Sequence, residues 1–270
     1  MPRNTTRRSG GQRAAPAFYF DRAAETMPRR ALAALQLERL QRTLANAYRN
    51  VPMHRDRMDA AGLKPRDVRS LADVKRLHFT LKTDLRDHYP FGLFARPRET
   101  LARLHASSGT TGRPTVVGYS ARDLRIWSDL MARSLAAAGV RPGDLLHNAY
   151  GYGLFTGGLG VHYGAERLGA TVVPVSGGMT ERQVTLLRDF KARAIAATPS
   201  YALAIAEVAA REGIDLRDSA LEVGVFGAEP WSDSMRREIE SRLGIRAVDI
   251  YGLSEILGPG GACECTEQAG

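Results

Sequence analysis

The chain has 270 residues, of which 44% are hydrophobic and 25% are charged, and it carries a formal net charge of +9. A chain of this length can bury one large apolar core or two smaller ones. It contains no run of about 18 apolar residues, so no membrane-spanning helix is expected. The first 17 residues hold four arginines but no apolar stretch, which argues against a secretory signal and leaves a transit peptide open.

The positive charge is concentrated at the N-terminus and does not indicate nucleic-acid binding. Residues 1–50 carry ten arginines against three acidic side chains, so they account for seven of the nine net charges. No nucleic-acid motif accompanies them. We predict a disordered basic tail at residues 1–17 and one domain over residues 18–270. Only two cysteines occur, Cys263 and Cys265, which is too few for a disulfide framework and favours a reducing cytoplasm.

The opening third of the chain is predicted to be helical. From Pro28 onward, apolar side chains recur at helical spacing, which predicts a helix as far as Arg49, before Val51-Pro52. Shorter helices are expected at residues 67–76 and 80–86. This segment carries no recognisable catalytic motif.

From residue 121 onward, predicted helices and strands alternate. The helices are expected at residues 121–139, 157–168, 180–190, 201–212 and 232–243, and the strands at 144–148, 170–175, 192–197, 221–226 and 247–250. Alternation of this kind is typical of βαβ units with a parallel sheet. We therefore predict an α/β fold in which a doubly wound, largely parallel sheet is flanked by helices and preceded by the helical segment.

Three short polar segments follow predicted strands of this sheet. They are Thr198–Tyr201 (TPSY), Gly227–Trp231 (GAEPW) and Tyr251–Glu255 (YGLSE). Ligands of doubly wound sheets bind beyond the carboxyl ends of the strands. We expect the three segments to form one site.

A fourth segment, Ser107–Thr115 (SSGTTGRPT), is rich in hydroxyls and glycines and lies between two strand-like stretches, 101–106 and 115–119. A Walker A loop would need Lys-Ser/Thr after its last glycine and would lead into a helix. Here Gly112 is followed by Arg-Pro and a strand, which excludes that fold. A hairpin loop that presents hydroxyls and backbone N–H groups suits polyphosphate oxygens, although such loops are also common as plain linkers.

SSGTTGRPT resembles the phosphate-binding signature of the adenylate-forming superfamily, which contains the acyl- and aryl-CoA synthetases. YGLSE resembles the second signature of that superfamily, aromatic-Gly-x-Ser/Thr-Glu. Four ordered motifs resemble the phenylacetate–CoA ligase family: YGYGLFTGGLG from Tyr150, HYGAE from His162, GAEPW, and YGLSEILGPG. The resemblance runs from about Phe18 to the end of the chain. It implies the large N-terminal domain of an adenylate-forming enzyme.

The resemblance also implies an activity and its ligands. An aryl carboxylic acid would be activated with ATP and Mg²⁺ to acyl-AMP and then transferred to coenzyme A. The nucleotide-binding residues would be Ser107, Ser108, Gly109, Thr110, Thr111, Gly112, Gly227, Ala228, Glu229, Pro230, Tyr251 and Gly252. Ser254 would contact the α-phosphate, and Glu255 would bind Mg²⁺; both are predicted catalytic residues. The acid would bind against Tyr150, Phe155, Gly157 and Gly158.

Several alternatives stand beside these assignments. Ser254 cannot be a hydrolase nucleophile of the Gly-x-Ser-x-Gly type, because Ile256 stands where the second glycine is needed. Glu255 would otherwise be a surface carboxylate, and His162 is predicted to be a packed or orienting residue. Cys263 and Cys265 supply two thiols where a structural zinc site normally needs four ligands.

The resemblance stops at Gly270. No residue matches the family's ribose-binding aspartate, and the small C-terminal domain with its catalytic lysine is not in the sequence. We expect the chain to be the N-terminal part of an aryl-CoA ligase. The alternative is a non-catalytic nucleotide- or acyl-binding remnant, or a subunit completed by a separate chain. The identity of the acid stays open; no nucleic-acid or membrane partner is expected, and a homodimer is possible.

Overall fold

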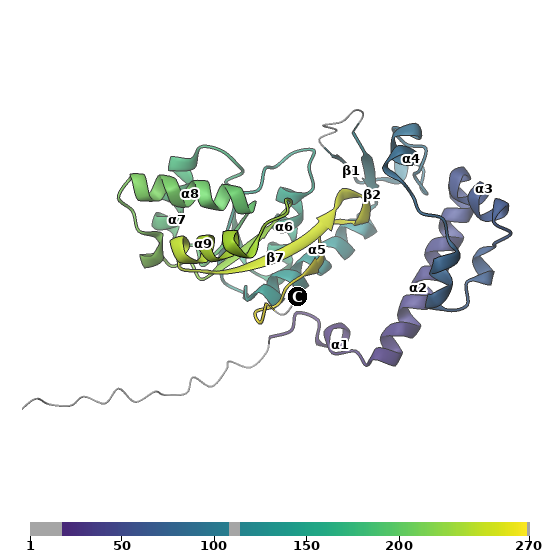
Figure 1. Ribbon diagram of the computed structural model, residues 1–270, viewed down its shortest axis with the longest axis horizontal. Coiled ribbons are helices and arrows are strands. Elements are labelled where there is room, and N and C mark those ends of the chain that lie inside the picture. The colour runs from purple at the N-terminus through teal and green to yellow at the C-terminus, as the bar shows by residue number, and fades with distance from the viewer. Residues whose placement is uncertain (1–17, 108–113, 269–270) are drawn as a thin grey trace, which may run out of the picture.

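The computed structural model describes residues 18–107 and 114–268. The predicted tail and the residues Ser108 to Gly112 of the phosphate loop lie outside this range. The N-terminal helices form an arm that projects from one side of the sheet domain (Figure 1). The arm contains α1 (Arg22–Glu25), α2 (Arg29–Asn50), α3 (Pro52–Ala60), α4 (Lys82–Asp87) and three 3₁₀ turns, at Pro65–Asp67, Leu71–Arg76 and Arg98–Thr100. The predicted helix at 28–49 is thus confirmed.

Pro52 does not end the helical segment, because α3 begins at this residue. Proline fits the first helical position, where its missing N–H would have no partner within the helix.

The main sheet has six strands in the order β4-β3-β5-β6-β7-β8. Its strands are β3 (Leu145–Asn148), β4 (Thr171–Val173), β5 (Ala194–Ala197), β6 (Val223–Gly227), β7 (Arg246–Leu253) and β8 (Gly258–Cys263). The pairs from β4 to β7 are parallel, and β8 is antiparallel to β7. A separate antiparallel hairpin joins β1 (Arg103–Ala106) to β2 (Val116–Tyr119).

Helices cover both faces of the sheet, which confirms the doubly wound prediction (Figure 1). One face packs against α5 (Ala121–Ala138) and α6 (Gly157–Leu168), and the other against α7 (Thr180–Phe190), α8 (Pro199–Arg211) and α9 (Asp233–Leu243). The four residues of β5 are buried and alternate between the two cores. No helix in the described residues is long and apolar enough to cross a membrane.

The strand order creates a switch point between β3 and β5. The chain leaves β3 toward β4 on one side, and it leaves β5 toward β6 and β7 on the other. The loops that follow β3 and β5 therefore diverge and leave room between them at the carboxyl edge. This is where ligands bind in doubly wound sheets.

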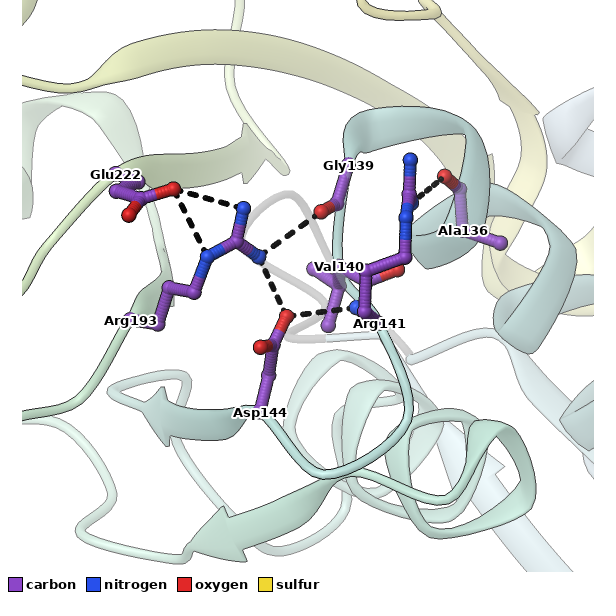
Figure 2. A network of polar contacts seen from close by, with 7 residues as sticks. All are labelled: Ala136, Gly139, Val140, Arg141, Asp144, Arg193 and Glu222. Carbon is purple, nitrogen blue, oxygen red and sulfur yellow. Dashed lines mark hydrogen bonds and ion pairs between the residues drawn. The ribbon is translucent and has the colours of Figure 1, made fainter. Parts of the chain in front are cut away.

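A network of charged groups lies at the opposite, amino-terminal edge of the sheet (Figure 2). Arg193 donates hydrogen bonds to Asp144 (2.5 Å), to Glu222 (2.9 Å) and to the Gly139 carbonyl (3.1 Å). Asp144 also accepts a bond from the backbone N–H of Arg141 at 2.7 Å. The network ties together the segments that enter β3, β5 and β6, so it fixes their spacing on the side away from the switch point.

The last two strands differ from the prediction. The predicted strand at 247–250 is the middle of β7, which continues through Tyr251 and Leu253, and β8 was not predicted. Residues 257–261 are rich in glycine and proline, a composition that is typical of loops. They form a strand because β7 offers them an antiparallel edge, with a bulge between Tyr251 and Gly252.

Candidate functional site

A cleft of about 470 Å³ opens at the switch point between β3 and β5. Its lining comes from the segments after β3, β4 and β5: Ala149, Tyr150, Gly151, Gly177, Thr198, Ser200, Tyr201 and Ala204. Thr198 caps the N-terminus of α8, where its hydroxyl accepts a bond from the Tyr201 N–H at 3.3 Å. The cleft thus combines an aromatic wall with small residues and a helix N-terminus, which favours anions.

The segment Gly227–Trp231 borders this cleft through Glu229. Its carboxylate accepts a hydrogen bond from the backbone N–H of Ser200 at 2.7 Å. Gly227 ends β6 in a space that admits no side chain, since an added Cβ would lie 2.3 Å from the Ile250 carbonyl oxygen. Ala228 follows with a left-handed backbone at φ 72°. The turn between β6 and Pro230 is therefore sharp, and its backbone comes close to the end of β7.

Tyr251 and Gly252 lie near the end of β7, and Ser254 begins a 3₁₀ turn, Ser254–Ile256. The Tyr251 ring is 54% exposed, so its face is free to stack on a planar ligand. Ser254 is buried, and its carbonyl accepts a bond from the Tyr119 hydroxyl at 3.0 Å. Glu255 is exposed, and its charge is one of the causes, after burial, that raise the pKa of Tyr119.

Two hydrogen bonds close the base of the predicted phosphate loop. The Ser107 N–H donates to the Thr115 carbonyl, and the Thr115 N–H donates to the Ser107 hydroxyl, each at 3.0 Å. Ser107 is therefore part of the hairpin that β1 and β2 form, as the sequence predicts. The Thr115 hydroxyl is buried and has no hydrogen-bond partner among the described residues. A buried donor of this kind at the foot of the loop suits a phosphate oxygen.

The predicted acid-binding residues meet around the start of α6. A Cβ added to Gly157 would lie 2.7 Å from the Phe155 ring and 3.4 Å from the Tyr150 ring. A Cβ on Gly158 would lie 2.5 Å from the Gly151 carbonyl oxygen. Phe155 is 45% exposed, whereas Tyr150 is buried, and burial raises the pKa of the Tyr150 phenol. Glycine at 157 therefore leaves room for the Phe155 ring, and glycine at 158 allows the close approach of the Gly151 backbone.

The loop after β4, which carries Gly177 into the cleft, was not predicted as part of the site. It contains left-handed backbone at Ser176 (φ 70°) and Met179 (φ 51°), conformations that these residue types rarely adopt. Gln183 of α7 holds the loop by donating to the Ser176 carbonyl at 2.6 Å and to the Gly178 carbonyl at 3.0 Å. The amide oxygen of Gln183 then faces His147, 2.5 Å from its Nε2.

This arrangement fixes the protonation of His147. Because the Gln183 oxygen can only accept, Nε2 of His147 carries the proton, and Nδ1 is buried with no partner among the described residues. Burial lowers the pKa of His147, and the bond to Gln183 opposes this shift only in part. The imidazole is therefore neutral in the folded chain.

A dependence of stability on pH follows. Unfolding restores the ordinary pKa of 6.5 to His147. Below that pH the unfolded chain binds more protons than the folded chain. The contribution of His147 to the free energy of unfolding is thus complete above pH 6.5 and decreases as the pH falls toward the lowered folded pKa, by at most about 1.4 kcal/mol per pH unit.

The measurement is denaturant unfolding between about pH 5 and 8 of the wild type and of His147→Gln. The pKa values of His54 and His105 are also lowered, mainly by burial, so only the difference between the two proteins reports His147. We expect the variant to lose less stability in acid than the wild type. Parallel curves would contradict the assignment.

The remaining predicted residues have simple surroundings. His162 lies between the Tyr152 hydroxyl at 3.1 Å and the Glu166 carboxylate at 3.2 Å, as an orienting residue would. Cys263 is half-buried against the Ser134 carbonyl, and burial raises its pKa.

Within residues 18–107 and 114–268, no group of three His, Cys, Asp or Glu side chains is placed to hold a metal ion by itself.

Comparison with known proteins decides the family. The AMP-binding enzyme family matches residues 34–269, which is most of the chain. The chain belongs to the AMP-binding enzymes. Among curated proteins, this AMP-binding chain is 59% identical over 244 residues to phenylacetate-coenzyme A ligase of Thermus thermophilus, and 60% identical over 237 residues to that of Escherichia coli. These matches cover 90% and 87% of the chain but 55% and 54% of the relatives, so the chain spans about half their length.

Solved structures of AMP-forming ligases show the same fold. An open conformation of 2-hydroxyisobutyryl-CoA ligase, in complex with 2-HIB-AMP and CoA, matches with a TM-score of 0.87 at 32% identity. The match covers 93% of this chain and 60% of that one. The same ligase in its thioesterification state gives a TM-score of 0.88 at 33% identity.

Proposed function

We propose that this chain is the nucleotide- and acid-binding part of an enzyme that activates phenylacetate, or a closely similar aryl acid, to its adenylate and then to its CoA thioester. The observation that carries the proposal is that the three predicted segments, at Thr198, Gly227 and Tyr251, lie on or directly after β5, β6 and β7, which are neighbours in the sheet. The first of them lines the cleft beside Tyr150, and the second is joined to it by the bond from the Ser200 N–H to Glu229. The third is joined to the β1–β2 hairpin by the bond from the Tyr119 hydroxyl to the Ser254 carbonyl. The identity to phenylacetate-CoA ligases supports the choice of acid.

The residues present fit ATP as a substrate. The adenine would lie along the backbone of Gly227 to Pro230, with the exposed ring of Tyr251 on its face. The phosphates would lie at the hairpin, where the buried Thr115 hydroxyl has no hydrogen-bond partner within residues 18–107 and 114–268. Glu255 would hold Mg²⁺ together with phosphate oxygens, because Mg²⁺ is usually bound by one or two carboxylates plus substrate phosphates. The metal would neutralise charge on the phosphates.

The reaction depends more on how the protein positions the substrates than on a reactive side chain of the protein. The carboxylate of the acid attacks the α-phosphorus, the bond to pyrophosphate breaks, and an acyl-adenylate forms. The thiolate of CoA then attacks the acyl carbon and releases AMP. Tyr150 and Phe155 would hold the ring of the acid so that its carboxylate faces the α-phosphate, which Ser254 would contact. Activity, substrates and the CoA step are proposed for the whole enzyme, since the matches cover only 55% and 54% of the relatives.

Phe155→Ala is expected to weaken the binding of the acid and to leave the binding of the nucleotide unchanged. Burying a phenylalanine side chain contributes about 1.5–3 kcal/mol, so the KM for phenylacetate should rise roughly tenfold to a hundredfold. The measurement is phenylacetate-dependent exchange of pyrophosphate into ATP, with the KM for ATP as the internal reference. Phe190→Ala serves as a control, since Phe190 is 51% exposed at the end of α7. An unchanged KM for the acid would place its pocket elsewhere.

A further inference from the structure

Three buried aromatic side chains lie together behind the proposed site. His105 on β1, Tyr119 on β2 and Trp127 on α5 are 1%, 3% and 3% exposed. The Tyr119 and Trp127 rings are stacked with centroids 5.2 Å apart. The His105 ring is T-shaped to both of the other rings, and its centroid lies 5.7 Å from that of Tyr119 and 5.8 Å from that of Trp127. We call these three residues the ring cluster.

Local structure explains why the three rings meet. His105 and Tyr119 belong to the two strands of one hairpin, so they lie near each other across it. Ser120 follows Tyr119 directly and caps α5 through reciprocal hydrogen bonds with Asp123. The cap fixes the start of the helix, and Trp127 lies about two turns along it, facing back toward the hairpin.

Each ring donates one hydrogen bond to a backbone carbonyl of a different segment. Nδ1 of His105 lies 2.9 Å from the Leu154 carbonyl, the Tyr119 hydroxyl lies 3.0 Å from that of Ser254, and Nε1 of Trp127 lies 2.9 Å from that of Pro259. Nδ1 of His105 must carry the proton, since a carbonyl can only accept. Nε2 has no partner among the described residues.

The carbonyls that accept these bonds are close to the residues assigned to the reaction. Leu154 precedes Phe155 and also accepts a bond from the Ala106 N–H at 3.0 Å. Ser254 precedes Glu255. The hairpin that carries His105 and Tyr119 also contains the predicted phosphate loop, between β1 and β2. The ring cluster therefore contacts the acid-binding loop at Leu154 and the turn that bears Glu255 at Ser254. Two of its rings lie on the strands that flank the predicted phosphate loop.

The packing around the rings leaves little room for adjustment. A Cβ added to Gly160 of α6 would lie 2.5 Å from the Trp127 ring, and one added to Gly258 of β8 would lie 2.4 Å from it. Closely packed interiors transmit a displacement instead of absorbing it. The position of one segment is thus coupled to the positions of the others.

We propose that His105, Tyr119 and Trp127 are positioning residues that set the relative positions of the bound acid, the phosphates of ATP and the Glu255 turn. This proposal rests on the proposed function, because these positions matter for catalysis only if the acid and ATP bind there. It predicts that losing a single donor changes the rate of adenylation more than it changes substrate binding. Misplacement of reacting groups lowers the rate even when the binding contacts remain.

Tyr119→Phe is the most direct variant, because it removes only the hydroxyl and keeps the ring stack. We expect kcat for phenylacetate-dependent pyrophosphate exchange to fall at least about tenfold, while the KM values for phenylacetate and ATP change less than about twofold. Tyr163→Phe is the matched control. Tyr163 lies on the neighbouring α6, and its hydroxyl makes no hydrogen bond among the described residues. This control should keep the wild-type kcat.

His105 allows a test by rescue. His105→Phe removes the donor and keeps an aromatic ring, whereas His105→Asn keeps an N–H donor close to the position of Nδ1. We expect the Phe variant to lower kcat and the Asn variant to recover part of it. A fall in kcat that follows only the melting temperature across these variants would mean that the rings act on stability alone, and it would overturn the proposal.

Amide hydrogen exchange of the ligand-free chain separates this proposal from the proposed function. Tyr119→Phe should speed exchange in residues 252–257 by about tenfold and leave residues 150–156 unchanged, and His105→Phe should do the reverse. If the wild type shows no adenylation at all, the proposed function fails, but these exchange patterns still report the ring cluster. Unchanged exchange in both segments would overturn the proposal, whatever the activity.

Discussion

Glu255→Gln is expected to reduce phenylacetate-dependent pyrophosphate exchange by at least about a hundredfold. Glu255 is an exposed carboxylate directly after the buried Ser254, on the turn that the Tyr119 hydroxyl holds in place. A glutamine keeps the shape of the side chain but removes the charge that would bind Mg²⁺ between enzyme and phosphates. A bound metal stabilises transition-state charge by several kcal/mol, and about 2.7 kcal/mol is already a factor of a hundred.

The measurement is the exchange rate as a function of Mg²⁺ concentration. If Glu255 binds the metal, raising the Mg²⁺ concentration should restore part of the lost rate. Glu207→Gln on the exposed face of α8 removes the same charge away from the cleft lining and serves as the control. A Glu255→Gln protein that matches the control at every Mg²⁺ concentration would remove Glu255 from the site.

Gly252→Ala is expected to destabilise the chain and to abolish nucleotide binding together. An added Cβ would lie 2.0 Å from the Gly258 carbonyl oxygen and 2.6 Å from its carbon, both of them backbone atoms that cannot rotate away. Overpacking of this kind typically costs about 1–3 kcal/mol and sometimes more. Relief requires β7 and β8 to separate at the bulge, which would displace Tyr251 next to it.

Gly261→Ala is the matched control, because it adds the same methyl group to β8 with its nearest contact at 3.6 Å. The measurements are the free energy of unfolding in urea and the affinity for ATP·Mg²⁺ by calorimetry. We expect the control to stay close to the wild type in both. Equal stability of the two variants would contradict the close approach of β7 and β8.

The central strands and the polar segments after them could be predicted from the sequence. Strand β5 is four buried apolar residues, Ala-Ile-Ala-Ala, between two helices, and such a pattern has few other interpretations in an alternating chain. The segments at Thr198, Gly227 and Tyr251 were predicted to meet because parallel strands bring their carboxyl ends to one edge. The strand order agrees with the placement of the strands, since β5, β6 and β7 are neighbours, whereas the joint site itself stays a prediction.

The features that the sequence did not reveal depend on non-local contacts. The loop around Gly177 reaches the cleft through left-handed backbone at Ser176 and Met179, which Gln183 stabilises from a helix turn away. Nothing in the residue types of this loop indicates that conformation. Strand β8 forms because it pairs with β7. Its glycines and proline are uncommon in strands, so the local sequence does not predict it.

The contacts of the ring cluster could not be predicted either, because they join residues that are far apart in the sequence. Tyr119 and Ser254 are 135 residues apart, and Trp127 and Pro259 are 132 apart. A single sequence gives no signal for such pairs. Their contacts become visible only when the hairpin, α5 and the β7–β8 pair are packed together.

The binding of a stable phenylacetyl-adenylate mimic tests the central claim most directly. In phenylacetyl-sulfamoyl-adenosine, a sulfamoyl group replaces the reactive phosphate, so calorimetry measures affinity for this chain without turnover. If the cleft holds an aryl adenylate, the mimic should bind roughly tenfold to a hundredfold more tightly than its acetyl counterpart, because only the former buries a phenyl ring. Phe155→Ala should remove most of that difference. Equal affinity for the two mimics, or no binding of either, would contradict the account.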